Sequence, residues 1–202
     1  MKYRVLKFST IALLTVCLTA CATDSYNSDS NSDNVSEPQQ SAQSNVIEES
    51  LGTIEIDGME FRLPCSYAAL TIYPTQDEAE WFPPEESNYA DGMYEQMISF
   101  RMNKDSNHSY SLRCAYPDGE SYKSGTIYSV LHNVDGATLT YYGEEFVCGE
   151  TTKEELVGKL GTQYTLSTTG AYIYTYQDGN VVAVFLDDTL TFITVTAVEG
   201  TE

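Results

Sequence analysis

A hydrolase needs a nucleophile beside a base, and histidine, the most frequent base, is scarce in this 202-residue chain. Its two histidines are His108, in a polar run, and His132, which ends the run Tyr128-Ser-Val-Leu-His132. Neither lies in a Gly-x-Ser-x-Gly or His-Glu-x-x-His pattern, the signatures of serine hydrolases and zinc proteases. We therefore expect His108 to be solvated, His132 to be a hydrogen-bonded residue at a strand end, and the chain to have no catalytic residue.

The cysteines leave two interpretations open. Five are present, and Cys65, Cys114 and Cys148 lie in the part of the chain with the composition of a folded domain. They could form one disulfide, with three candidate pairings, or pack as small apolar side chains. Cys114 or Cys148 could in principle pair with His132 as thiolate and base. The sequence contains no Cys-x-x-Cys motif.

Adjacent carboxylates are numerous but do not define a site. Glycoside hydrolysis needs two carboxyl groups at a defined separation across a cleft. With 30 acidic residues, adjacent pairs are expected without any such cleft. We expect neither a metal nor a cofactor, because no calcium-loop pattern is complete. The adjacent pairs are Glu85-Glu86, Glu144-Glu145, Glu154-Glu155 and Asp187-Asp188.

Residues 77–95 form an acidic segment with two prolines and four aromatic residues, which predicts a long loop. Trp81 and Phe82, next to a diproline, could be an exposed anchor with a charged rim. Alternatively, Trp81, the only tryptophan, covers one end of the core. The candidate partner-binding residues are Trp81, Phe82, Tyr89 and Tyr94.

The net charge of −20 excludes one class of partner. Nothing in such a chain offsets repulsion by phosphates, so we expect no nucleic-acid binding. The same charge disfavours lying flat on anionic lipid headgroups, which attract basic segments.

The N-terminus has the features of an export signal. A basic head of Lys2, Arg4 and Lys7 precedes the apolar run 11–18, which is too short to span a membrane. Leu18-Thr19-Ala20-Cys21 follows and resembles the lipobox of bacterial lipoprotein signal peptides. That resemblance implies removal of residues 1–20 and acylation of Cys21, for example with palmitate. The alternative is ordinary cleavage after Ala22.

The predicted signal contains three basic residues and no Asp or Glu, so its removal changes the net charge of the chain from −20 to −23. Residues 21–50 are rich in Ser, Asn, Asp and Gln, which predicts a lipidated cysteine followed by a disordered linker. Residues 51–202 are long enough for one domain with a core of its own. We expect this domain on the outer face of the cell membrane, held by its lipid anchor; a Gram-positive cell surface is what the family resemblance given below implies.

The domain shows mostly strand-like alternation. An Asp57-Gly58 turn predicts a hairpin, and an Asp135-Gly136 turn predicts another. Further strands are expected at 96–102, 110–116, 126–133, 137–142, 145–148, 171–176, 181–186 and 190–198. The best helix begins with a capping box, Thr151 with Glu154, and ends at Gly161.

We predict an α+β fold, mainly an antiparallel sheet with one or two short helices. Residues 53–61 align with 138–146 at an offset of 85, and Ser66 then falls on Thr151. One interpretation is therefore two tandem repeats of hairpin, helix and three strands, in halves 51–136 and 137–202.

Two resemblances bear on function. The segment Gly149-Glu-Thr-Thr-Lys-Glu-Glu-Leu-Val-Gly-Lys-Leu-Gly161 is similar to a motif of small lipoproteins and inhibitors with the β-lactamase-inhibitor-protein-like fold, although the proline usual after its Leu-Gly is absent. Residues 57–67 resemble a family of uncharacterised surface lipoproteins of Gram-positive gut bacteria. Both resemblances imply binding to another protein and transfer no catalytic residue.

The expected function is therefore a non-enzymatic binding or interaction module that contacts a protein or cell-wall component. The contact surface would be the acidic aromatic loop or an exposed sheet face. The alternative is a cell-wall-directed hydrolase that uses carboxylates or a Cys/His pair.

Overall fold

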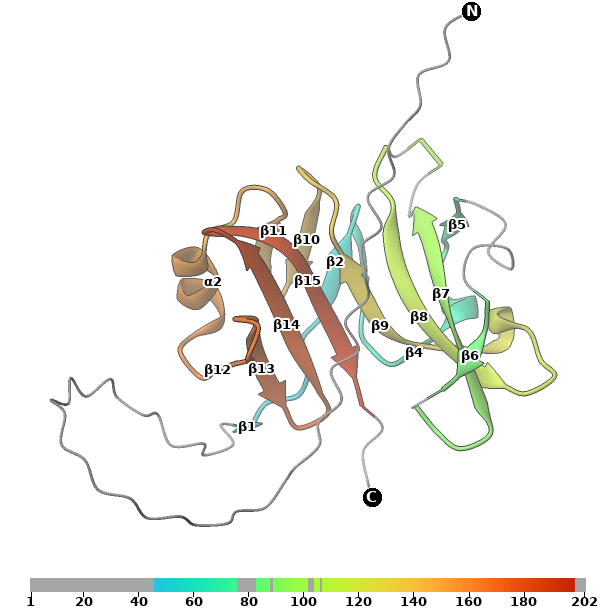
Figure 1. Ribbon diagram of the computed structural model, residues 1–202. Coiled ribbons are helices and arrows are strands. Elements are labelled where there is room, and N and C mark those ends of the chain that lie inside the picture. The colour runs from blue at the N-terminus through green and yellow to red at the C-terminus, as the bar shows by residue number, and fades with distance from the viewer. Residues whose placement is uncertain (1–45, 76–82, 88, 102–103, 106, 199–202) are drawn as a thin grey trace, which may run out of the picture. The chain divides into compact units, whose positions relative to one another are not determined.

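The structure is a computed structural model that describes residues 46–75, 83–87, 89–101, 104–105 and 107–198. Most of its regular elements are strands, arranged in two sheets (Figure 1). Residues 1–45 lie outside the described part, so the signal, Cys21 and most of the linker stay predictions. Val46–Ile47 already form a strand, β1, five residues before the predicted start of the domain.

The larger sheet runs in the order β13-β14-β15-β9-β8-β7, with antiparallel neighbours throughout. In this order the strands are Tyr172–Tyr176, Gly179–Leu186, Thr189–Ala197, Thr126–His132, Tyr110–Pro117 and Met93–Arg101. Short strands extend it: β4 (Cys65–Ser66) on β9, β5 (Tyr73–Pro74) and β6 (Glu85–Glu86) on β7, β12 (Thr165–Leu166) on β13, and β1, parallel to β13.

The smaller sheet has the order β11-β10-β2-β3. Its strands are Glu144–Val147, Thr138–Tyr141, Ile54–Ile56 and Met59–Phe61. The predicted hairpin at Asp57-Gly58 is present and joins β2 to β3, with φ of 50° and 80° at its two turn residues. Such paired positive φ values match the twist of a two-residue hairpin and favour Asp-Gly sequences.

The helix α2 (Lys153–Leu160) begins one residue later than predicted. Thr152 accepts from the N–H of Glu155, and the Glu155 side chain accepts from the N–H of Thr152, which completes the capping box. The predicted cap, Thr151, instead accepts a 2.8 Å hydrogen bond from the N–H of Val147. Gly161 ends the helix as expected, with φ of 85°.

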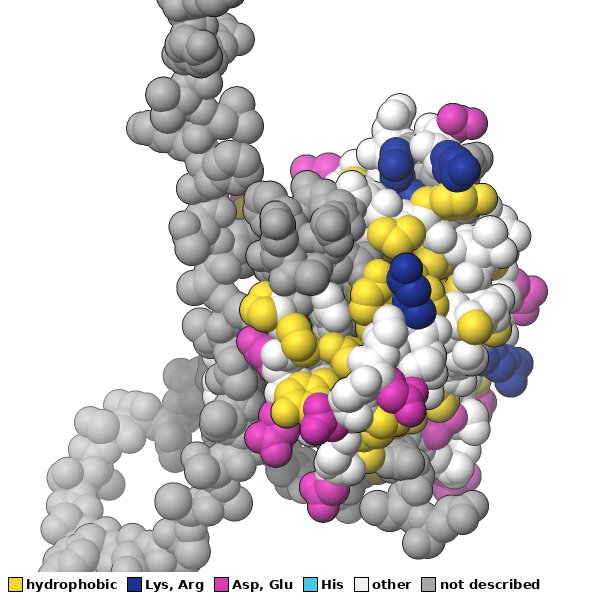
Figure 2. Space-filling model, turned by 90° about the vertical axis from the view of Figure 1, so that its right-hand side faces the viewer, with side chains coloured by type: hydrophobic (Ala, Val, Ile, Leu, Met, Phe, Trp, Pro, Cys, Tyr) yellow, Lys and Arg dark blue, Asp and Glu magenta, His cyan; other side chains and the backbone are white. Residues whose placement is uncertain are grey.

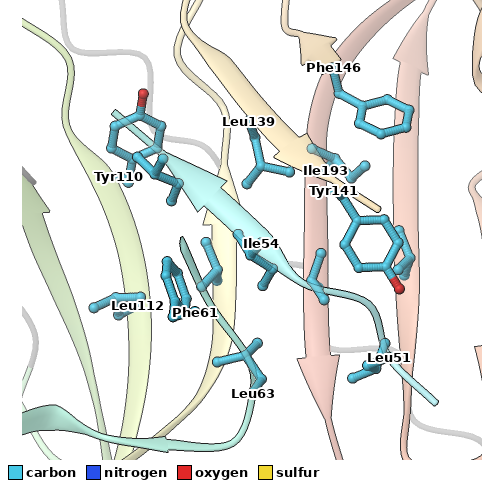
Figure 3. Packing of buried hydrophobic residues seen from close by; sticks show 14 of the residues in the cluster. Leu51, Ile54, Phe61, Leu63, Tyr110, Leu112, Leu139, Tyr141, Phe146 and Ile193 are labelled. Atoms are coloured by element: carbon cyan, nitrogen blue, oxygen red, sulfur yellow. The ribbon is translucent and has the colours of Figure 1, made fainter. Parts of the chain in front are cut away.

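The core lies between the two sheets and under α2. Figure 3 shows side chains of the smaller sheet, including Ile54 and Leu139, between its strands and those of the larger sheet. They meet Leu112 of β8 and Ile193 of β15, and all four are fully buried. Burial of these apolar faces drives the sheets together and leaves the opposite face of the larger sheet to form a surface.

The predicted α+β class is wrong: the fold is mainly β. In the described part of the chain, α2 is the only α-helix, and η1 (Tyr67–Ala69) and η2 (Tyr122–Ser124) are single 3-10 turns. The first of the two predicted repeats therefore lacks its helix. Ser66 pairs with β9 through β4 and makes no side-chain cap for η1, so the chain there is held extended.

Two further expectations about the sheets are wrong. The larger sheet is mixed, because β1 and β13 are parallel. Asp135-Gly136 does not close a hairpin, because β9 and β10 belong to different sheets. The N–H of Gly136 bonds instead to the carbonyl oxygen of Cys148 at 2.9 Å, which turns the chain from one sheet to the other.

Residues 46–52, the N-terminal segment, are held along β13 and β14. The N–H of Leu51 donates to Asp178 Oδ1 at 2.6 Å, and the N–H of Gly52 donates to the Tyr141 hydroxyl at 3.1 Å. The Leu51 side chain is only 4% exposed. The domain therefore includes this segment as part of its packing.

Candidate functional site

The face of the larger sheet that points away from the smaller sheet, here called the outer face, carries two rows of side chains across neighbouring strands. Residues directly opposite in antiparallel strands point to the same side, so each row is a contiguous strip of surface. Figure 1 shows the larger sheet in front of the smaller sheet, with the outer face toward the viewer. The rows are Met97–Arg113–Ser129–Thr196 and Ser99–Ser111–Leu131–Thr194, from β7 through β8 and β9 to β15.

Residues of both rows line a surface hollow of about 220 Å³, here called the outer hollow. Three hydroxyl residues from different strands, Ser111, Ser129 and Thr194, contribute to its lining. Met97 and Leu131 supply apolar surface beside them. The outer hollow therefore combines hydrogen-bonding groups and apolar surface on a rigid sheet.

One end of the outer hollow is organised by Glu95, Arg113 and Tyr128. Arg113 Nη1 lies 3.1 Å from Glu95 Oε1, and the Tyr128 hydroxyl donates to Glu95 Oε2. The Glu95 side chain is 12% exposed and that of Arg113 is 40% exposed. Burial raises the pKa of the Tyr128 hydroxyl, and its hydrogen bond to Glu95 raises that pKa further. Glu95 therefore holds a protonated tyrosine on one side and an accessible guanidinium on the other.

Two of the four candidate partner-binding residues are described, and they do not lie together. Tyr89 packs on Tyr128, with ring centroids 5.0 Å apart, so it belongs to the network beside the outer hollow. Tyr94 is 36% exposed and, by strand alternation, points to the opposite side of β7 from Glu95. Trp81 and Phe82 lie outside the described residues.

A second hollow, of about 310 Å³, lies over the smaller sheet and is acidic. Glu55, Asp57 and Glu145 line it, together with His108. Glu55 is directly opposite Glu60, and such like-charge pairs are destabilising. Within the described ranges, no three His, Cys, Asp or Glu side chains are arranged to hold a metal ion.

The Cys148 thiol bonds to the main chain of His132, and the His132 imidazole bonds to another residue. All three described cysteines are free, so no disulfide pairs them. Burial raises the pKa of the Cys148 thiol to about 12, and that thiol donates to the main-chain oxygen of His132 at 3.5 Å. The His132 imidazole is fully buried, its Nε2 bonds to the Ala137 carbonyl oxygen at 2.8 Å, and desolvation lowers its pKa. This geometry holds both groups neutral.

A different surface lies at the β7 edge of the larger sheet, near η1 and η2. Figure 2 shows this side of the molecule, where hydrophobic side chains gather and both basic and acidic side chains lie among and around them. Tyr67 and Tyr122 form an edge-on ring pair with centroids 5.4 Å apart, and Lys123 Nζ lies 5.9 Å from the Tyr122 ring centroid. This side thus combines apolar area with charged side chains of both signs.

Sequence reasoning missed Glu95, Arg113 and Tyr128 as a group. The available signal was the alternation of residues 93–101 and 110–114, which places Glu95 and Arg113 on one side of their respective strands. Pairing them required the register of β7 on β8, which puts Arg113 opposite Met97, two residues from Glu95.

No helix in the described part is long and apolar enough to cross a membrane. Comparisons with protein-family models, with characterised proteins and with solved structures find no match to this chain. The two resemblances noted in the sequence therefore stay predictions.

Proposed function

We propose that this protein is a non-enzymatic binding module that is anchored to the outer side of the cell membrane through a lipid on Cys21. Its partner, a protein or cell-wall component, binds to the outer face of the larger sheet. The lipobox-like Leu18-Thr19-Ala20-Cys21 supports the anchor, and the linker that follows would let the domain reach away from the membrane.

The observation that carries the proposal is the Glu95–Arg113–Tyr128 network at the outer hollow. A nearly buried carboxylate fixes a guanidinium at the rim of a concave, polar surface. Binding sites are typically concave, with a few polar groups that are held in place before the ligand arrives. The groups fixed here can position a ligand through several hydrogen bonds.

The test is photo-cross-linking on intact cells, with a photoreactive amino acid at Thr194 on the outer face. A matched control carries the same amino acid at Glu60, an exposed residue on the smaller sheet. We expect a cross-linked partner from position 194 and none from position 60. Adducts from position 60 alone, or from neither position, would contradict the proposal.

The anchor is tested separately by Cys21→Ala. The expected result is release of the protein into the culture medium, because removing the acylated cysteine removes the lipid. Retention of the variant in the membrane fraction would show that Cys21 is not the anchor.

A further inference from the structure

We infer that the outer hollow binds an uncharged sugar unit of a glycan, which makes the proposed module a glycan-binding one. This inference rests on the proposed function, because it names the ligand of the same surface. It follows from the charge, the unused hydrogen-bonding groups and the size of the outer hollow.

Charge disfavours ionic ligands. Within the outer hollow, the guanidinium of Arg113 is paired with Glu95 at 3.1 Å, so neither is an unmatched charge. Glu85 of β6 lies directly opposite Glu95, which adds negative charge beside the pair. The chain as a whole carries −20, which repels anions. No carboxylate is among the described residues that line the outer hollow, so a cation finds no opposite charge inside it. A neutral ligand needs no such partner.

The hydrogen-bonding groups match a polyhydroxylated ring. Ser111 and Thr194 flank Leu131 in one row, and neither hydroxyl has a hydrogen-bond partner among the described residues. Each can donate one hydrogen bond and accept others. Arg113 adds further N–H donors beyond the one that faces Glu95. Sugar hydroxyls both donate and accept, so they can satisfy all of these groups.

Apolar groups lie among the polar ones. Met97 and Leu131 line the outer hollow beside the hydroxyl residues, and the Tyr128 ring closes one end. A sugar ring presents C–H groups between its hydroxyls, and contact between these and the apolar side chains would remove apolar surface from water.

The size suits one unit of a chain. Sites for drug-sized molecules enclose about 300–1,000 Å³, whereas this one holds about 220 Å³. The outer hollow lies on a sheet face, where neighbouring sugar units could extend along the rows.

The experiment is a titration of the protein, followed by NMR or calorimetry, with oligosaccharides matched in shape and different in charge. N-acetylglucosamine oligomers are neutral, and the deacetylated glucosamine oligomers are their cationic counterparts. Galactose oligomers are neutral, and galacturonate oligomers are their anionic counterparts. We expect saturable binding of at least one neutral oligomer and weaker binding of its charged counterpart. Stronger binding of the charged member of each pair, or no binding of any oligomer, would overturn the inference.

Substitutions in the lining of the outer hollow test whether the saccharide binds there. Arg113→Ala and Thr194→Val should each weaken binding, by about tenfold or more for Arg113, because charged hydrogen bonds are the stronger ones. Arg62→Ala is the control, since Arg62 is exposed on the chain after β3 and its loss changes the charge equally. Arg113→Ala leaves the nearly buried Glu95 with its Tyr128 hydrogen bond but without its ion pair, so Thr194→Val serves where that variant unfolds. Unchanged binding in Thr194→Val and in a folded Arg113 variant would refute the site.

The two experiments distinguish failure of the glycan inference from failure of the proposed function. If a protein is cross-linked at position 194 and no saccharide binds, the proposed binding module stands and the glycan inference is wrong. If no partner is cross-linked and no saccharide binds, both are wrong.

Discussion

Replacing Gly179 by alanine tests how the N-terminal segment is held on the domain. A Cβ at this position would lie 2.3 Å from Leu51 Cδ1 and 2.3 Å from the carbonyl oxygen of Thr196. Leu51 can move away by leaving its pocket. The Thr196 carbonyl belongs to β15, whose pairing with β14 fixes its position.

The magnitude follows from these two contacts. Overpacking a well-filled site costs about 1–3 kcal/mol, and exposing the buried Leu51 side chain forfeits about 1.5–3 kcal/mol. If Leu51 moves out, the overpacking at residue 179 falls while the cost of exposing Leu51 rises, so the two costs do not add in full. We therefore expect Gly179→Ala to lower the free energy of unfolding by about 2–4 kcal/mol. Urea titration followed by circular dichroism measures this change.

The chain offers a matched control in Gly158→Ala. Gly158 lies in α2, and a Cβ there would meet nothing within 4 Å. That substitution should stabilise the protein by up to about 1 kcal/mol, because alanine is the better helix former. Amide hydrogen exchange provides a second measurement, since displacement of the segment would expose the Leu51 N–H that now bonds to Asp178. Equal stability of the two variants, with Leu51 still protected, would refute the reasoning.

Two further predictions concern titratable side chains. Hydrogen bonds from the Thr152 N–H and hydroxyl lower the pKa of Glu155, so its ionised form stabilises the folded state above its ordinary pKa of 4.5, and this contribution is lost as pH falls through the lowered pKa. Glu155→Gln should therefore melt below the wild type at neutral pH, with a difference that closes in acid; a constant difference across pH would contradict this. Burial raises the thiol pKa to about 11 for Cys65 and to about 12 for the fully buried Cys148. Alkylation of the folded protein, read by mass spectrometry, should label the partly exposed Cys65 first, and equal labelling rates would contradict the burial of Cys148.

Strands could be predicted well where one face of the sheet is buried. Residues 110–114 alternate between buried and half-buried positions, and the predicted strand 110–116 corresponds closely to β8. The helix start was off by one residue because Thr151 and Thr152 can both cap. The choice between them depends on the contact of Thr151 with Val147 in β11, which helix patterns do not contain.

The sheet pairing and the site could not be predicted in the same way. β1 is two residues of a polar stretch, and its partner lies far along the chain. The predicted α+β class gave too much weight to the one helix after Thr151, since α2 has 8 residues beside a sheet of 11 strands. The second helix, which the repeat interpretation places at Ser66, is prevented by the pairing of Ser66 with β9. Arg113 and Glu95 alternate correctly in sequence, but their contact depends on strand register, and register is set by the whole core.

The parallel pairing of β1 with β13 has a mechanical consequence under the proposed anchoring through Cys21. Tension on the chain before residue 46 would pull along β1, so the bonds between Val46–Ile47 and Thr175–Tyr176 would be loaded in shear and would break together. The hydrogen bonds of Leu51 and Gly52 lie behind them as a second point of resistance. A domain fastened in this manner should keep its fold when flow or a bound partner drags on it.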